Sequence, residues 1–305
     1  MSEPASELTV VAEKYSFLEG PRWHDGRIWV SDFYTHQVVS ADEHGGDLRV
    51  EAQVPGQPSG LGWLPDGRLL VVSMRDHRVL RRESDGELAL HADLSEHATG
   101  VLNDMVVDAV GRAWVGNFGF DLMNEAPMAP APLVRIDPDG ATDVATEPLH
   151  FPNGAVIIGA ELVVAETFGH RLSAFDIAAD GSLRDRRDWA TFGPLPDTTD
   201  VGEALAGLTV APDGMALDGE GAVWVADAIG NRVLRVRKGG EVVDEISTGD
   251  TGVYAVALGG EDGRTLYLCT APGFAESERR HTREARLLAA RVEVPAATNP
   301  PPLTP

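Results

Sequence analysis

Four short polar motifs stand out because their side chains could together bind a cation. They are Glu19-Gly20-Pro21, Leu102-Asn103-Asp104, Pro152-Asn153-Gly154 and Pro212-Asp213-Gly214. Each motif comes just before a short apolar strand, a glycine-containing turn and a second apolar strand. Carboxylate and carboxamide oxygens are the ligands that hard divalent cations prefer. If the fold brings the four motifs together, the sequence predicts a divalent-metal site.

A repeat in the apolar segments indicates how the fold could do this. Strand-like tripeptides recur roughly every 45 residues, apart from one longer interval. The copies are Ile28-Trp29-Val30, Leu69-Leu70-Val71, Ala113-Trp114-Val115, Leu162-Val163-Val164, Val223-Trp224-Val225 and Leu266-Tyr267-Leu268. Further strand-like runs and glycine turns fill each unit. Six units of four short strands are typical of an all-β, six-bladed β-propeller. A long sandwich or two barrels would not predict so regular a spacing.

A propeller must close its ring without leaving a free strand edge. We expect Leu8–Ala12 to supply the outer strand of the blade whose other strands come from the C-terminal part of the chain, near Arg286–Val294. Residues 1–295 would then form a single domain. The proline-rich stretch 296–305 cannot pair in a sheet and is expected to be a tail.

Loop lengths predict which end of the ring carries a site. The turns expected on one face are short and rich in glycine, whereas three long insertions, 117–132, 191–211 and 271–284, fall on the other. The first strand of each blade starts on the face with the long insertions. Binding sites concentrate where long loops cover a rigid scaffold. The four motifs are therefore expected at this face.

Asp213 needs a separate argument, because the tripeptide Pro-Asp-Gly also occurs at 65–67 as an ordinary hairpin turn. In the fifth unit the sequence Asp218-Gly219-Glu220-Gly221 already supplies that turn. Pro212-Asp213-Gly214 must therefore open the first strand. Its position in the repeat, and not the motif itself, predicts that Asp213 faces the channel.

Polar residues also end the second strand of several units. Asp32, Asn117, Glu166 and Asp227 return to the same face as the motifs, and Asp104 directly follows Asn103. These side chains could orient the ligands or hold water. They could equally be solvated strand ends.

Composition excludes several other classes of protein. The net charge is −23 and no basic stripe is present, which disfavours nucleic-acid binding. No apolar run reaches the roughly 18 residues of a membrane span, and the N-terminus has no pattern of a signal peptide. One cysteine, Cys269, allows no intrachain disulfide. We therefore expect a cytoplasmic protein. Motifs for a zinc peptidase, a serine hydrolase, a P-loop or a dinucleotide site are absent.

The ordered set of motifs resembles the family of senescence marker protein, gluconolactonase and luciferin-regenerating enzyme. The resemblance implies a six-bladed propeller with one divalent cation in its channel. It implies that Glu19, Asn153 and Asp213 bind this metal and that Asp213 also transfers protons. Asn103 would contact the substrate or a metal-bound water, and Asp121 would contact the substrate.

One departure from the family pattern concerns the substrate. Sugar-lactonase members carry an arginine two residues before the asparagine that matches Asn103, and Val101 stands there in this chain. The arginine provides a charge and several hydrogen-bond donors. Val101, together with Phe118 and Phe120, favours a more apolar lactone or ester.

The predicted function is hydrolysis of a lactone or similar cyclic ester by metal-activated water, with Asp213 as the proton shuttle. Ca²⁺ is the favoured metal, with Mg²⁺, Mn²⁺ or Zn²⁺ as alternatives. A second hypothesis keeps the same metal but hydrolyses a phosphotriester or fluorophosphate. A third is a calcium-stabilised propeller that serves as an interaction scaffold, with its channel plugged by loop side chains. The expected partner is a small-molecule lactone or ester, and the oligomeric state is left open.

Overall fold

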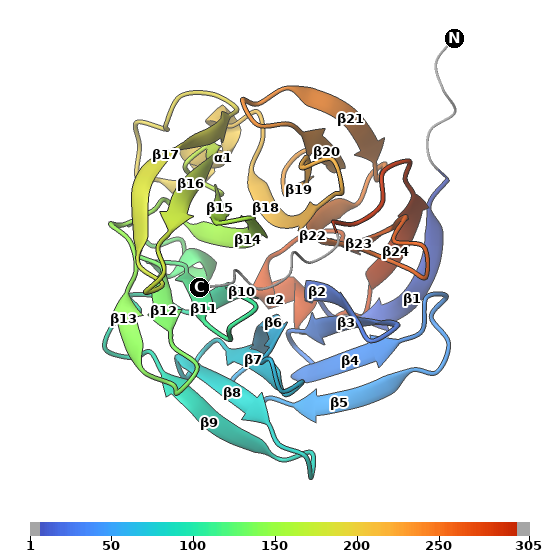
Figure 1. Ribbon diagram of the computed structural model, residues 1–305. Helices are drawn as coiled ribbons and strands as arrows, with labels where there is room; N and C mark the ends of the chain where they lie inside the picture. Colours follow the sequence, from blue (N-terminus) through green and yellow to red (C-terminus); the bar gives the residue numbers. More distant parts are fainter. Residues whose placement is uncertain (1–6, 298–305) are drawn as a thin grey trace.

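The fold is known from a computed structural model, which describes residues 7–297. Six antiparallel four-stranded sheets form a ring around a central axis (Figure 1). The predicted six-bladed β-propeller is confirmed. The strands of the first three blades are β2 (Leu18–His24), β3 (Arg27–Asp32), β4 (Gln37–Ala41) and β5 (Arg49–Gln53); β6 (Pro58–Trp63), β7 (Leu69–Ser73), β8 (Arg78–Arg82) and β9 (Leu88–Asp93); and β10 (Leu102–Val107), β11 (Ala113–Asn117), β12 (Val134–Ile136) and β13 (Thr142–Val144).

The other three blades complete the ring, and the chain ends close it. Their strands are β14 (Pro152–Ile158), β15 (Glu161–Glu166), β16 (Arg171–Ile177) and β17 (Leu183–Thr191); β18 (Pro212–Leu217), β19 (Val223–Asp227), β20 (Arg232–Val236) and β21 (Val242–Ser247); and β22 (Gly252–Gly259), β23 (Thr265–Ala271), β24 (Ala285–Arg291) and β1 (Thr9–Tyr15).

Strand β1 is the outer strand of the sixth blade, where it pairs antiparallel with β24. The predicted closure by the N-terminal strand is thus confirmed, although β1 extends further along the chain than 8–12. Ala296 and Ala297, which we expected to lie in a tail, are hydrogen-bonded to the propeller. The Ala296 amide donates to the Gly263 carbonyl at 2.7 Å, and Ala297 donates to Leu217 at 3.2 Å. They connect the fifth and sixth blades, while 298–305 lie outside the described residues.

Repeated tryptophans hold neighbouring blades together. Trp29, Trp114 and Trp224 occupy the same position in the second strand of their blades, and all are buried. Trp114 of the third blade, for example, packs in one apolar cluster with Leu162 and Phe175 of the fourth. Burial of such large aromatic surfaces is a main source of stability in a fold whose blades contact only their neighbours. The tryptophan that recurs in the repeat therefore belongs to the core of the blades.

The first strand of every blade carries an irregularity at the same place. The register between first and second strands shifts in all six blades, for example between Glu19 and Arg22 and between Pro212 and Met215. Such bulges bend a strand and redirect the adjacent side chains. Neighbouring first strands lie close together near these bulges. A Cβ atom added to Gly154 would lie 2.7 Å from the carbonyl oxygen of Asp213.

This close approach makes Gly154 sensitive to substitution. Gly154→Ala is expected to lower the free energy of unfolding by roughly 1–3 kcal/mol, because the added methyl group forces the backbones of two blades apart. Urea unfolding followed by circular dichroism measures the change. Gly207→Ala is the matched control, since nothing lies within 4 Å of its added Cβ. Equal stability of the two variants would contradict the close approach.

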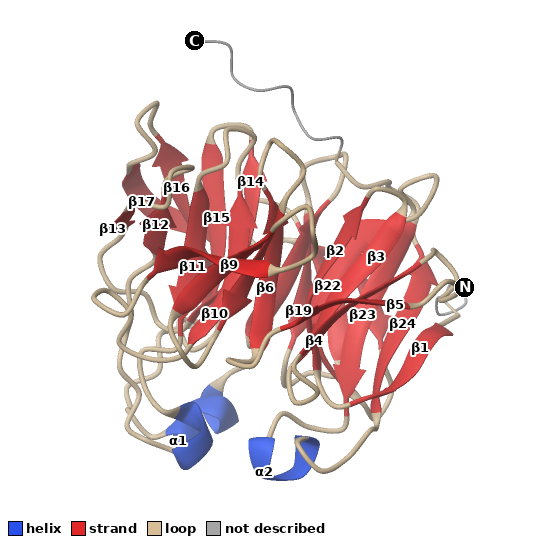
Figure 2. Cartoon of the chain, turned by 90° about the horizontal axis from the view of Figure 1, so that it is seen from below, coloured by secondary structure: helices blue, strands red, loops and turns tan. Residues whose placement is uncertain are grey.

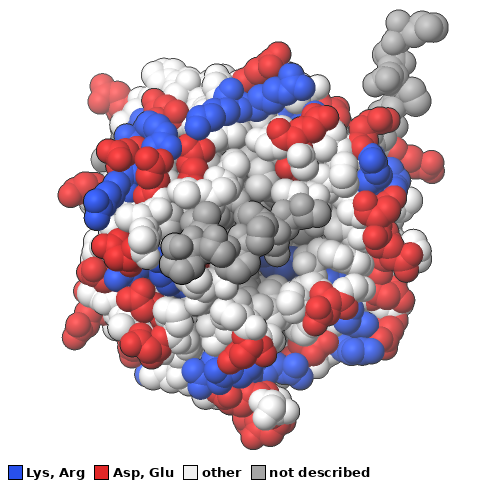
Figure 3. Space-filling view, viewed as in Figure 1, with Lys and Arg blue, Asp and Glu red and all other residues white. Residues whose placement is uncertain are grey.

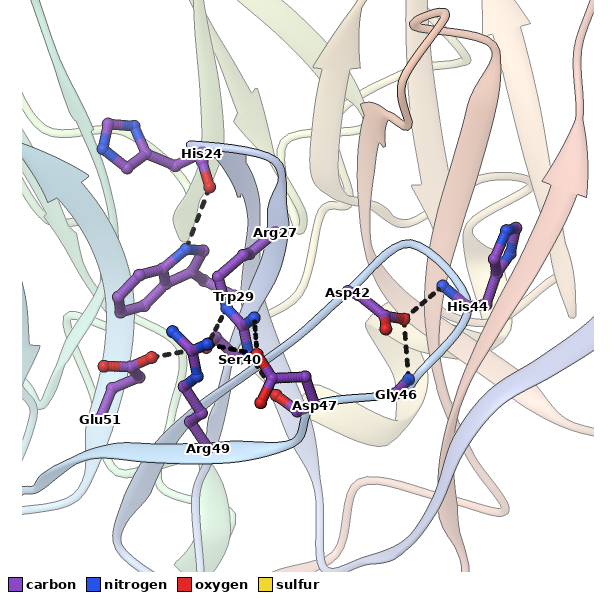
Figure 4. Close-up of polar contacts among 10 residues, drawn as sticks. All are labelled: His24, Arg27, Trp29, Ser40, Asp42, His44, Gly46, Asp47, Arg49 and Glu51. Carbon is purple, nitrogen blue, oxygen red and sulfur yellow. Dashed lines mark hydrogen bonds and ion pairs between the residues drawn. The ribbon is translucent and has the colours of Figure 1, made fainter.

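The two faces of the ring differ as the loop lengths predicted. Helices α1 (Val201–Gly207) and α2 (Glu276–Arg279) lie at the same end of the molecule (Figure 2). The first of the long insertions, 117–132, carries the 3₁₀ helix η1 (Leu122–Asn124). The hairpin turns within blades are short, and in the first blade the Asp42 carboxylate accepts hydrogen bonds from the amides of His44 and Gly46 at 2.9 and 2.8 Å (Figure 4).

Acidic and basic side chains alternate around the rim of the face seen in Figure 3. Several of these charges form ion pairs across hairpins, and the Arg27 guanidinium lies 2.8 Å from the Asp47 carboxylate. Within residues 7–297, no helix is long and apolar enough to cross a membrane.

Candidate metal centre and cavity

Glu19, Asn103, Asn153 and Asp213 line one cavity at the axis of the propeller. Each residue belongs to the first strand of a different blade and lies at the second residue of that strand, directly before the bulge. All four are buried, with exposed fractions between 5% and 8%. The equivalence of blades thus explains how motifs that are far apart in the chain meet at one place.

Hydrogen bonds fix the two carboxamides, that of Asn103 to the next blade and that of Asn153 within its own blade. Asn103 donates its Nδ2 to the carbonyl of Pro152 at 3.4 Å, and Asn153 donates its Nδ2 to Thr167 Oγ1 at 3.2 Å. Thr167 in turn donates to the carbonyl of Pro212 at 2.8 Å. Because the amide nitrogens serve as donors, the carboxamide oxygens are the atoms available to a cation or a substrate donor.

Burial disfavours the ionised forms of Glu19 and Asp213. Burial raises the pKa of Glu19 to about 8, and the nearby Asp104 carboxylate adds to this effect. Burial also raises the pKa of Asp213 well above its ordinary value, and the negative charges of Glu19 and Asp104 raise it further. Among the described residues, Asp213 Oδ1 has no hydrogen-bond partner although it is buried. Such a group is stabilised by a bound cation.

The chemistry of this donor set fits a hard divalent ion. Glu19 and Asp213 provide carboxylate oxygens and Asn153 provides a carboxamide oxygen, which are the ligand types of Ca²⁺, Mg²⁺ and Mn²⁺. No cluster of three or more His, Cys, Asp or Glu side chains suited to a metal occurs in residues 7–297. The candidate centre has only two carboxylates, Glu19 and Asp213, and carboxamide oxygens would have to provide its other protein ligands.

Asp104 has a different environment from its neighbour Asn103. Its carboxylate pairs with the Arg22 guanidinium at 2.7 Å and accepts a hydrogen bond from the Met105 amide at 2.8 Å. Asp104 does not line the cavity. It acts on the centre through its charge, and the ion pair joins the first blade to the third.

The polar residues at the ends of second strands are buried, so the solvated interpretation is wrong for them. Asp32 accepts hydrogen bonds from the amides of Ser16 and Phe17, and Asn117 accepts them from Thr99 and Gly100. In both blades the bonded amides belong to the segment that leads into the first strand.

The same arrangement recurs in the fourth and fifth blades. Glu166 accepts from the His150 amide at 2.8 Å, and Asp227 accepts from the Ala211 amide at 3.0 Å. These side chains do not line the cavity. They position the strand that carries the site residue of the same blade.

Removal of one such anchor is expected to destabilise the protein. Asp227 is fully buried, and it also pairs with Arg232 Nε at 3.0 Å. Asp227→Ala leaves the Ala211 amide and Arg232 Nε without their acceptor, while Arg232 keeps its contacts to Glu245 and to the Thr209 carbonyl. The free energy of unfolding should therefore fall by about 3 kcal/mol. Chemical denaturation measures it, with the exposed Asp250→Ala as control. A loss below about 0.5 kcal/mol would contradict the anchoring role.

Two of the expected substrate contacts lie beside the centre rather than in it. Val101 and Asp121 line a neighbouring cavity of about 300 Å³, whereas Phe118 lines both cavities. The Asp121 carboxylate caps η1, accepting from the Asn124 amide and, at 2.7 Å, from its Nδ2. Asp121 is therefore held by its own loop and separated from the carboxylate cluster.

Several residues of the site were missed from the sequence. Thr167 links two blades at the centre, and Tyr254 enters the cavity from the first strand of the sixth blade. Ser59 is the second residue of the first strand in the second blade, the position that Glu19 has in the first blade. Its buried Oγ lacks a hydrogen-bond partner within the described residues. Alignment of the six first strands could have found Ser59 and Tyr254, whereas the wall residues in loops carry no local motif.

The architecture and the centre together define a class: a six-bladed propeller with buried carboxylates and carboxamides at its axis. A family model described as the SMP-30/Gluconolactonase/LRE-like region matches residues 17–272. The chain belongs to this family, as the resemblance of its motifs predicted.

Similar proteins include two curated relatives. A 6-deoxy-6-sulfogluconolactonase of Pseudomonas putida is 30% identical over 220 residues, which cover 68% of each chain. A pentonolactonase of Haloferax volcanii is 26% identical over 259 residues, covering 84% of this chain and 81% of the relative.

Solved structures share the fold. A calcium-binding regucalcin from Agrobacterium tumefaciens superimposes with a TM-score of 0.78 at 19% identity, covering 97% of both chains. A luciferin-regenerating enzyme gives a TM-score of 0.77 at 18% identity, covering 96% of this chain and 98% of the other. At these identities the likeness concerns the fold alone.

Proposed function

We propose that this protein opens a lactone by metal-assisted hydrolysis, with Asp213 as the general base. One observation carries the proposal: a buried Asp213 oxygen, which has no hydrogen-bond partner within residues 7–297, lies at a cavity that Glu19 also lines. The names of two curated relatives, a sulfogluconolactonase and a pentonolactonase, support a lactone as the substrate.

Glu19, Asn153 and Asp213 would hold the divalent ion, with Ca²⁺ favoured over Mg²⁺, Mn²⁺ and Zn²⁺. The calcium-binding regucalcin of the same fold supports this choice. A bound divalent ion supplies Lewis acidity and makes water more acidic. The carboxylates contribute charge, and the hydrogen bonds from Asn153 to Thr167 and from Thr167 to the Pro212 carbonyl join the fourth blade to the strand that carries Asp213.

The protein's own groups would carry the protons. Asp213 accepts a proton from the attacking water and delivers it to the ring oxygen as the carbon–oxygen bond breaks. A carboxylate within reach of the attacking water can act as such a general base. Asn103 donates to a substrate oxygen or orients the water, and Phe118, Val101 and Asp121 shape the space for the rest of the substrate.

The cavity also bears on the other two hypotheses. A non-enzymatic scaffold was expected to have a plugged channel, and the cavity beside the carboxylates favours an enzyme instead. Phosphotriester or fluorophosphate hydrolysis would use the same centre.

Initial rates on lactones, a phosphotriester and a fluorophosphate, each before and after chelation, test the proposal. Lactone turnover that stops on chelation and returns with a divalent ion is expected. Turnover of the phosphorus compounds alone would contradict it.

A further inference from the structure

We infer that the substrate of this site is an apolar lactone with an alkyl or aryl substituent and not a polyhydroxylated sugar lactone. The inference rests on the proposed function and concerns the walls of the cavity. These walls are built from aromatic rings, whereas polar groups gather at the carboxylate cluster.

The first and sixth blades provide one aromatic wall. The ring centroids of Phe17 and Tyr254 are 4.8 Å apart, and those of Tyr254 and Phe274 are 6.5 Å apart. Phe17 directly precedes the strand that carries Glu19, so this wall begins beside the centre. Phe274 lies in the insertion that also carries α2 and extends the wall outward.

The third and fourth blades provide the opposite wall. Phe118 and Phe151 have ring centroids 4.4 Å apart, and Phe151 contacts Phe168 with a centroid distance of 5.3 Å. All three rings are buried and line the cavity. Packed rings of this kind form a rigid surface that binds apolar groups and offers no hydrogen-bond donor.

The polar groups of the cavity are too few for a sugar. No Lys, Arg or His side chain is among its described lining residues. Beyond the four residues of the centre, the lining supplies hydroxyls from Tyr34, Tyr254 and Thr167, and Thr167 already bonds within the protein. A substrate hydroxyl buried without a partner weakens binding by roughly tenfold. A sugar lactone would incur this loss several times.

The neighbouring cavity does not replace the missing arginine. Val101 and Arg75 both line this second cavity. The Arg75 guanidinium already donates hydrogen bonds to the Glu276 carboxylate and to Gln57 Oε1, each at 2.7 Å. The two cavities share apolar residues, including Phe33 and Leu122. A substituent on the lactone ring can therefore lie against these shared walls.

Three lactones with the same six-membered ring test the inference. With Ca²⁺-loaded protein, kcat/KM for δ-decanolactone should exceed that for unsubstituted δ-valerolactone by about 1000-fold, because each of the five buried carbons of the pentyl chain contributes roughly fourfold. The value for glucono-δ-lactone should lie below both. A preference for glucono-δ-lactone would overturn the inference while leaving the proposed lactonase function intact.

A binding measurement separates failure of the inference from failure of the function. The lactam analogues of δ-decanolactone and glucono-δ-lactone resist hydrolysis, and calorimetry with the wild-type protein gives their affinities. If no lactone is turned over, the proposed function fails. Tighter binding of the pentyl-substituted lactam than of the sugar lactam would still support an apolar site. Equal or weaker binding of the pentyl-substituted lactam would overturn the inference.

A wall variant locates the specificity. Phe274 is 36% exposed, so Phe274→Ser should fold normally. We expect it to raise KM for δ-decanolactone about tenfold and to change KM for δ-valerolactone less than twofold. Leu48→Ser, at an exposed leucine outside the cavity lining, is the matched control and should change neither value. Equal effects of Phe274→Ser on both substrates would contradict recognition of the substituent by this wall.

Discussion

Asp213→Asn should lower kcat for lactone hydrolysis by about 10³-fold. The substitution keeps the size of the side chain but removes its ability to accept a proton. It also removes one negative charge beside Glu19, so metal affinity should fall. Activity measured over a series of Ca²⁺ concentrations separates the two effects, because a loss caused only by weak binding is recovered at high Ca²⁺.

The sequence contains a matched control for this variant. Asp66 lies in an identical Pro-Asp-Gly tripeptide, but its carboxylate is at an exposed hairpin turn, where it bonds to Arg68. Asp66→Asn should retain full activity. Circular dichroism should show both variants folded, since asparagine keeps the size of the side chain in each. Full turnover by Asp213→Asn at saturating Ca²⁺ would remove Asp213 from the mechanism.

The contrast between Asp66 and Asp213 also shows how far the sequence can predict this site. Local sequence does not separate the two residues, because their tripeptides are the same. The repeat separates them, since a blade needs only one turn between its first two strands and the fifth blade has that turn at 218–222. Positions that obey the repeat, such as Glu19 and Asn153, could therefore be placed before the structure was known.

Features that depend on side-chain packing between distant segments could not be predicted in this way. The aromatic walls join Phe274, in an insertion, to Tyr254 and Phe17 from two blades, and no spacing in the chain records that contact. Burial of Asp32 was missed for a related reason. A polar residue at a strand end is ordinarily solvated, but here the segment entering the first strand of the same blade folds over it.

The second large effect concerns removal of the metal. Chelation should abolish lactone turnover and lower the melting temperature, by an amount that depends on pH. In the metal-free protein the pKa of Glu19 is raised from 4.5 to about 8, chiefly by burial. A carboxyl group with a raised pKa favours the folded state fully below its unfolded pKa, and this contribution is lost as the pH rises through 8. The metal-free protein should therefore lose stability between pH 5 and 8.

A bound cation reverses this loss, because it stabilises the carboxylate that burial disfavours. At pH 8, Ca²⁺ at about 100 times its dissociation constant should add ~2.7 kcal/mol, or roughly 4 °C in melting temperature. At pH 5 the proton on Glu19 competes with the cation, so the same Ca²⁺ concentration should raise the melting temperature much less. Thermal scans at both pH values, with EDTA or Ca²⁺, measure the difference.

Glu19→Gln tests the origin of this pH dependence. The amide keeps the shape of the side chain but does not titrate, so the metal-free variant should lose less stability than the wild type between pH 5 and 8. Its gain from Ca²⁺ should also be smaller, because one charged ligand is missing. An equal Ca²⁺-induced shift in wild type and variant would mean that the ion binds elsewhere. The proposed centre at the propeller axis would then be wrong, even if chelation still stopped turnover.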